Sequence, residues 1–131
     1  MKGEKVYTNQ PVKDEDNAHP VAEVWRPTLR QIVGALCRGD YEVSEGIEDV
    51  APVAQDVAHQ MRASVADYGE QLVDLPEETW KTSVCQWMGT RWEVLVDLWT
   101  VESGRSDLVL FVNVSECKTG FRFEVYSLYV P

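Results

Sequence analysis

The spacing of apolar residues changes from a helical to an alternating period after residue 76. Before that point, apolar residues recur three and four positions apart, which predicts one helix over 20–38 and a second over 52–68. A glycine follows each stretch, where glycine commonly ends a helix in the left-handed conformation. Pro27 either kinks the first helix or marks the start of its regular part.

Three stretches after residue 76 alternate apolar with other side chains and predict strands over 92–99, 108–115 and 121–126. Their connections are short, so consecutive strands are antiparallel neighbours in a meander. Residues 79–88 fit either a helix or a strand, and the turn-like 88–91 favours a fourth strand. We therefore predict an α+β domain in which two N-terminal helices pack on a C-terminal antiparallel sheet of three to four strands.

The polar N-terminus differs from the rest of the chain. Residues 1–18 show no hydrophobic period and predict a flexible arm, whereas 19–131 predict a single domain. A chain of 131 residues can bury a sufficient core without a disulfide or a metal.

The two faces of the predicted sheet differ from an ordinary half-exposed sheet. One face is almost entirely apolar and is assigned to the core beneath the helices, but the opposite face is also rich in apolar residues. These residues are Leu95, Trp99, Val109, Phe111, Tyr126 and Leu128. Because an apolar patch of this kind favours a cover, we expect the N-terminal arm, the 69–76 linker, a partner protein or a second copy of the chain to lie on it.

Charge narrows the class of partner. The chain carries 12 Lys and Arg against 22 Asp and Glu, a formal net charge of −10. This balance argues against direct nucleic-acid binding and favours attraction to a basic protein. The densest acidic stretch contains Asp40, Glu42, Glu45, Glu48 and Asp49. No apolar run is long enough for a membrane span or a secretory signal, and three widely spaced cysteines suggest free thiols, so we expect a cytoplasmic protein.

Candidate chemistry is sparse, and we expect no cofactor and no metal. The two histidines, His19 and His59, are far apart in the sequence, and no cysteine pair has the spacing of a zinc site. No nucleophile, phosphate or dinucleotide motif is present. Glu93 and Asp97 would share a strand face about 13 Å apart, which exceeds the separation of about 6.5–9.5 Å in inverting glycosidases. Asp97 is interpreted as one half of a structural ion pair with a cross-strand arginine, Arg105 or Arg122.

Three segments resemble a family of small bacterial proteins of unassigned function. They are the stretches at 95–100 (Leu-Val-Asp-Leu-Trp-Thr), 104–108 (Gly-Arg-Ser-Asp-Leu) and 128–131 (Leu-Tyr-Val-Pro). This resemblance extends from about His19 to the end and implies no catalytic or binding residues. In size, acidity and α+β layout the chain is also similar to immunity proteins of bacterial toxin–immunity systems, including contact-dependent inhibition. Those proteins commonly bind a cationic toxin domain, often a nuclease, and block its active site.

The resulting hypothesis is a non-enzymatic protein-binding module, an immunity protein that occludes a basic toxin domain. Electrostatic steering is assigned to Asp40, Glu42, Glu45, Glu48 and Asp49. Aromatic anchoring is assigned to Trp99, Phe111 and Tyr126. The alternative is a small-molecule-binding domain or small enzyme, with a pocket between helices and sheet lined by Trp80, Trp87 and Trp92. A homodimer through the second sheet face is a third possibility.

Overall fold

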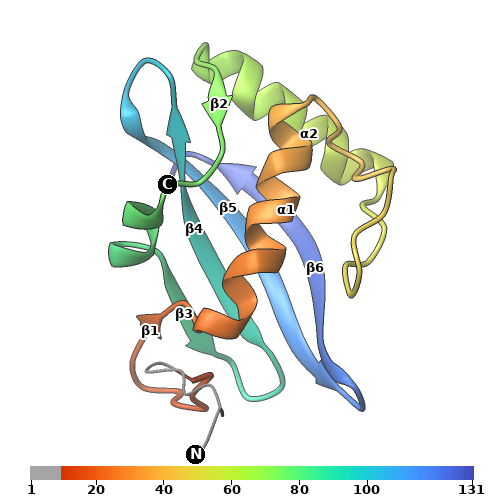
Figure 1. Cartoon of the computed structure of the whole chain (residues 1–131), viewed down its shortest axis with the longest axis vertical. Helices are drawn as coiled ribbons and strands as arrows, with labels where there is room; N and C mark the ends of the chain where they lie inside the picture. The colour runs from red at the N-terminus through yellow and green to blue at the C-terminus, as the bar shows by residue number, and fades with distance from the viewer. Residues whose placement is uncertain (1–9) are drawn as a thin grey trace, which may run out of the picture.

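Two helices lie on one face of a six-stranded antiparallel sheet in the computed structural model, which describes residues 10–131 (Figure 1). The helical elements are the 3₁₀ turn η1 (Glu23–Trp25), α1 (Arg26–Cys37), α2 (Gln55–Tyr68) and the 3₁₀ turn η2 (Glu77–Lys81). The strands are β1 (His19–Pro20), β2 (Leu72–Val73), β3 (Val84–Trp87), β4 (Trp92–Thr100), β5 (Gly104–Cys117) and β6 (Gly120–Tyr129). The α+β class and the order of helices before sheet are as predicted.

The sheet is wider than the sequence pattern indicates. Its strand order is β1-β3-β4-β5-β6, and β2 pairs with the end of β4 beyond β3. The predicted meander of β4, β5 and β6 is confirmed. The prediction of three to four strands was too low because β1 and β2 have only two residues each, too few to show a period.

The prediction of a strand over 79–88 is only half right, because η2 occupies its first part and β3 its second. Side-chain hydroxyl groups in η2 and just after its end take the place of a missing strand beside β4. Thr79 Oγ1 donates to the carbonyl of Asp97 (2.6 Å), and the Asp97 N–H donates to Ser83 Oγ (2.9 Å). The edge of β4 between β2 and β3 is therefore closed by side chains.

The C-terminal ends of both helices follow the sequence signals, but α1 begins at Arg26 and α2 at Gln55, later than the predicted starts at 20 and 52, and Pro20 lies in β1. Regular α1 starts at Arg26, so Pro27 lies in its first turn, where the missing N–H costs nothing. Gly39 and Gly69 follow the two helices with φ of +81° and +79°, the left-handed conformation that glycine adopts without strain.

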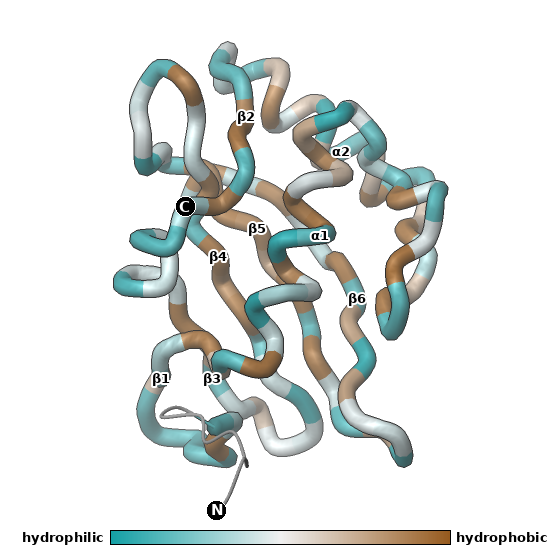
Figure 2. The backbone as a smooth tube through the Cα atoms, in the orientation of Figure 1, coloured by the Kyte–Doolittle hydropathy of each residue, from teal (hydrophilic) through white to brown (hydrophobic). Residues whose placement is uncertain are grey.

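The core face was correctly predicted except for one residue. Its alternate positions on β4, β5 and β6 are buried except Phe121, which is half-buried against the core, as the brown positions behind α1 in Figure 2 illustrate. Leu128 was assigned to the opposite face, but it is 0% exposed. Val112 pairs with Val125 whereas Phe111 pairs with Ser127, so Tyr126 is an extra residue. This β-bulge reverses the alternation and turns Leu128 into the core.

One of the two internal covers proposed for the second face, the 69–76 linker, lies elsewhere. The 69–76 linker forms β2 and buries Leu72 and Leu75 in the core on the α1 side. Residues 10–18 of the arm lie against β3 and β4: the Trp92 indole donates to the Val12 carbonyl, and Gln86 donates to the Asp14 carbonyl. Residues 1–9 of the predicted arm lie outside the described part of the chain.

Candidate functional site

The acidic loop, residues 40–49, joins the C-terminal side of α1 to the segment before α2. Its apolar residues Tyr41 and Val43 are buried in the core, whereas Glu42, Glu45, Glu48 and Asp49 are exposed. Asp40 turns inward along the loop and accepts hydrogen bonds from the N–H and the hydroxyl of Ser44, both at 3.0 Å. The backbone hydrogen bond from Ser44 lowers the pKa of Asp40, which keeps this carboxylate ionised. The loop therefore presents a defined row of carboxylates.

Contacts at both ends hold the acidic loop in place. Arg62 of α2 lies over the Tyr41 ring, with its guanidinium carbon 4.7 Å from the ring centroid, and donates to the carbonyl of Gly39 (3.2 Å). At the other end, the Phe123 N–H of β6 donates to the Asp49 carbonyl (2.8 Å), and the chain then forms an isolated parallel bridge with β6. A binding surface that is already ordered loses less entropy when it meets a partner.

Two loop residues have left-handed backbones that only glycine adopts freely. Val43 has φ of +52° and Asp49 has φ of +69°. For a β-branched residue such as Val43 this conformation is rare and unfavourable. Burial of the Val43 side chain offsets that cost and fixes the direction of its acidic neighbours.

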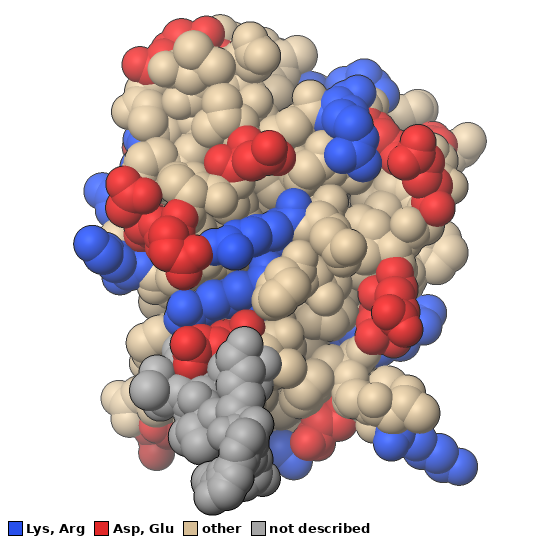
Figure 3. Space-filling model, in the orientation of Figure 1, with Lys and Arg blue, Asp and Glu red and all other residues tan. Residues whose placement is uncertain are grey.

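The outward carboxylates are available to pair with a positively charged partner. Within the described residues, Glu42, Glu45, Glu48 and Asp49 form no ion pair. Figure 3 shows acidic groups distributed around the α1 side of the molecule, with Lys and Arg groups between them. The predicted steering residues thus belong to one surface feature.

The predicted aromatic anchors do not share that surface. Phe111 and Tyr126 form a ring pair (centroids 4.9 Å apart) on the sheet face opposite the core, where the bulge places Tyr126 beside Phe111. Trp99 pairs with Arg105 near the end of β4, and its ring packs 3.7 Å from the position that a Cβ on Gly104 would occupy. Trp99 also packs against the core cluster. The structure therefore separates the steering residues from the anchors.

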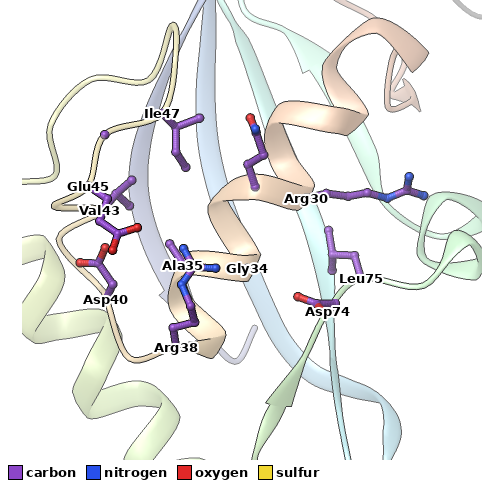
Figure 4. Close-up of a pocket in the computed structure, with 12 residues that line it drawn as sticks. Arg30, Gly34, Ala35, Arg38, Asp40, Val43, Glu45, Ile47, Asp74 and Leu75 are labelled. Atoms are coloured by element: carbon purple, nitrogen blue, oxygen red, sulfur yellow. The ribbon is translucent and has the colours of Figure 1, made fainter.

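A groove beside the acidic loop was not predicted. It has a volume of about 470 Å³ and lies between α1, the loop and the segment after β2 (Figure 4). A sequence signal for it exists: Arg30, Gly34 and Arg38 recur every four residues, which places them on one face of α1. The remaining lining residues are Gln31, Ala35, Asp40, Val43, Glu45, Gly46, Ile47, Asp74 and Leu75.

The tryptophans of the alternative hypothesis are packed against other side chains. Trp92 is 1% exposed, and its ring centroid lies 4.6 Å from that of Trp87 and 5.1 Å from that of Trp25. Trp80 lies elsewhere, beneath the guanidinium groups of Arg26 (5.2 Å) and Arg30 (5.8 Å). These rings act as core and as a platform for arginines, so they do not converge on a shared ligand space.

One arrangement resembles a nucleophilic triad but lacks the required chemistry. His19 and Cys85 are partners across β1 and β3, and His19 Nε2 lies 2.9 Å from Asp14 Oδ2. However, Cys85 Sγ donates to the carbonyl of Pro20 (3.4 Å), and burial raises the pKa of this thiol. A buried thiol with a raised pKa is a poor nucleophile.

The carboxylates of β4 have structural partners. Glu93 pairs with Arg91 (3.2 Å). The interpretation of Asp97 as half of an ion pair was wrong: within the described residues no cation pairs with it, and Thr82 Oγ1 donates to its carboxylate at 2.5 Å. The reason is that Thr82, which caps the end of η2, lies at the edge of β4, so that its hydroxyl contacts the Asp97 carboxylate.

Within the described residues, no cluster of three or more His, Cys, Asp or Glu side chains is placed to hold a metal ion. Among the described helices, none combines the length and apolar character needed to cross a bilayer.

Comparison with known proteins identifies one family. The model of a domain of unknown function (DUF7668) matches residues 33–131, which include the acidic loop and nearly all of the sheet. No curated protein and no solved structure matches the chain.

Proposed function

The chain belongs to the DUF7668 family, a domain of unknown function, and we propose that it is a non-enzymatic module that binds a basic protein domain through the acidic loop. The observation that carries the proposal is the anchoring of this loop. Its apolar residues Tyr41 and Val43 are buried and its ends are tied to α2 and β6, while Glu42, Glu45 and Glu48 are exposed.

The electrostatics of the whole chain support the same proposal. A net charge of −10 attracts a positively charged partner from a distance, and a fixed acidic loop directs that partner to one surface. Such steering accelerates association more than it slows dissociation.

In its most specific form, the proposal is an immunity function in the cytoplasm. The partner is a basic toxin domain, such as a nuclease, and the acidic loop covers the cationic groups that the toxin uses on its own substrate. Support comes from the charge of the chain and from its similarity in size, acidity and layout to immunity proteins.

The test first looks for a basic toxin domain in the neighbouring reading frame or by capture from the source cell, and then measures its association with the chain by stopped-flow fluorescence. We expect E42Q/E45Q/E48Q to slow association by about ten-fold or more at low salt and to flatten its salt dependence. The control D56N/D67N/E78Q makes the same change in net charge at exposed positions outside the loop. Equal association rates for the two triple variants would overturn the role of the loop.

The occlusion step has its own readout. Toxin activity on its substrate should fall in proportion to the complex formed with the wild-type chain. Full toxin activity in a saturated complex would contradict the immunity function while leaving protein binding in place.

A further inference from the structure

We propose that the groove between α1 and the acidic loop receives one cationic side chain, a lysine or an arginine, from the partner protein. This inference rests on the proposed function and deepens it, because it names the contact that holds the complex after electrostatic encounter. Its basis is the shape of the groove, the charge on its two sides and the arginine that lies between them.

The floor of the groove is formed by a glycine inside a helix. Gly34 lies in the middle of α1, where glycine makes the helix less stable than alanine would. A Cβ at this position would lie 3.6 Å from Arg38 Nη1 and 3.7 Å from Asp74 Oδ1, which are ordinary contact distances. Packing therefore does not require glycine here, and its effect is to lower the floor between the groove walls.

Carboxylates stand on both sides of this floor. Asp40 and Glu45 come from the acidic loop, and Asp74 comes from the segment after β2 (Figure 4). Within the described residues, none of the three forms an ion pair. A cation placed between the walls would be attracted from both sides, whereas an anion would meet three negative groups.

The two arginines of the groove have different roles. Arg30 points away from the floor in Figure 4; it pairs with Glu77 and lies 5.8 Å from the Trp80 ring centroid. Arg38 lies between the walls beside Gly34, and its charge adds to the larger effect of the Ser44 hydrogen bond in lowering the pKa of Asp40. Arg38 forms no ion pair with a described residue. Because no ion pair holds its guanidinium between the carboxylates, the partner's cation displaces Arg38 on binding.

The apolar lining suits the rest of such a side chain. Val43 is buried and Ile47 is half-buried on the loop side, and Leu75 is buried on the opposite side. Lysine and arginine both carry a methylene stem that packs on apolar surface while the charged end meets carboxylates. The groove thus matches both parts of a long cationic side chain.

The first test is a titration of the full chain, followed by ¹⁵N NMR, with N-acetyl-arginine amide and, as the uncharged probe, N-acetyl-glutamine amide. We expect saturable shifts at the amides of Gly34, Ile47 and Asp74 with the arginine probe only, at a dissociation constant of about 1 mM, the weak range for a single side chain. Shifts that do not saturate, or equal shifts with both probes, would overturn the inference.

Charge variants test whether the groove prefers a positively charged side chain. R38Q removes the internal competitor and should tighten binding of the arginine probe by about five-fold, the effect of one charge about 4 Å away when water screens the interaction. D74N should weaken binding by a similar factor, and D56N, outside the groove, should leave it unchanged. Weaker binding of the arginine probe to R38Q than to wild type would show that Arg38 does not compete with the probe, and would overturn the inference.

A shape variant tests the floor independently. G34M fills the groove with a residue that favours helix, so it should abolish probe binding while the far-ultraviolet circular dichroism is retained. If G34M reduces the helical signal, G34A is tested in its place, because the local distances accommodate a Cβ at this position. We expect G34A to cause an intermediate loss of affinity for the arginine probe. Wild-type affinity in a folded Gly34 variant overturns the role of the floor.

Failure of this inference can be distinguished from failure of the proposed function. If the partner protein depends on the acidic loop for association but dissociates at the same rate from R38Q, D74N and wild type, the groove inference falls and the proposed function stands. If the arginine probe binds as expected but no difference separates the two triple variants, the proposed function falls and the groove stands.

Discussion

Gln60 of α2 completes the hydrogen bonding of Leu128 at the free edge of β6. Gln60 Nε2 donates to the Leu128 carbonyl (2.6 Å), and the Leu128 N–H donates to Gln60 Oε1 (3.3 Å). A side-chain amide offers the same donor and acceptor as a peptide group. A helix residue thus takes the place of a neighbouring strand, as Thr79 and Ser83 do at β4. Edges closed in this way offer less backbone for pairing between chains.

Replacing Gln60 by alanine should reopen the β6 edge. We expect a loss of about 1–3 kcal/mol in the free energy of unfolding, because the Leu128 peptide group loses both of these partners, and the measurement is urea denaturation. Light scattering should also show more self-association. H59A, at an exposed neighbouring position of α2, is the control. Equal stability of the two variants would mean that water replaces Gln60 without cost.

The bulge at Tyr126 predicts opposite outcomes for two nearby residues. L128A should cost about 2–5 kcal/mol, because Leu128 is fully buried and its truncation leaves a cavity. Y126A should cost less than about 1.5 kcal/mol, since Tyr126 is 59% exposed and loses only its contact with Phe111. Both values come from chemical denaturation. The reverse order would indicate a regular β6 without the bulge.

The three cysteines should react at different rates. Cys117 is exposed, whereas burial raises the pKa of Cys85 and raises that of Cys37 to about 11. Because the thiolate is the reactive form, iodoacetamide should modify Cys117 first in the native protein. Mass spectrometry of the native and the denatured chain measures this order. In C117S, rapid native modification of either remaining cysteine would contradict the described burial.

The Asp14–His19 pair predicts a dependence of stability on acid. The hydrogen bond from His19 is the main cause that lowers the pKa of Asp14 from 3.8 to about 2. A carboxyl whose folded pKa is lowered contributes stability above its unfolded pKa and loses that contribution as the pH falls through the folded value. The difference in thermal midpoint between wild type and D14N should therefore shrink from pH 4 towards pH 2.

The control for this acid dependence is D16N. The Asp16 side chain accepts no hydrogen bond from a described residue in the structure, so its removal should not produce the same trend. A D14N difference that is constant between pH 4 and pH 2 would contradict the effect of His19 on Asp14.

The sequence by itself determined the two helices, the β4–β6 meander and the core face. These features depend on local period and on turn residues such as Gly39, so neighbouring positions contain the information. The acidic loop could also be predicted, because five carboxylates in one short stretch are a local property of the chain.

Only the tertiary structure decided the rest. Leu128 turns inward because the pairing of β5 with β6 inserts one extra residue, and a slip of one position exchanges the faces of a strand. Likewise, Arg38 and Asp74 meet beside Gly34 only because β2 pairs with β4 and brings the following segment against α1. Strand register and contacts between distant segments depend on how the whole chain packs, and no local pattern of residues specifies them.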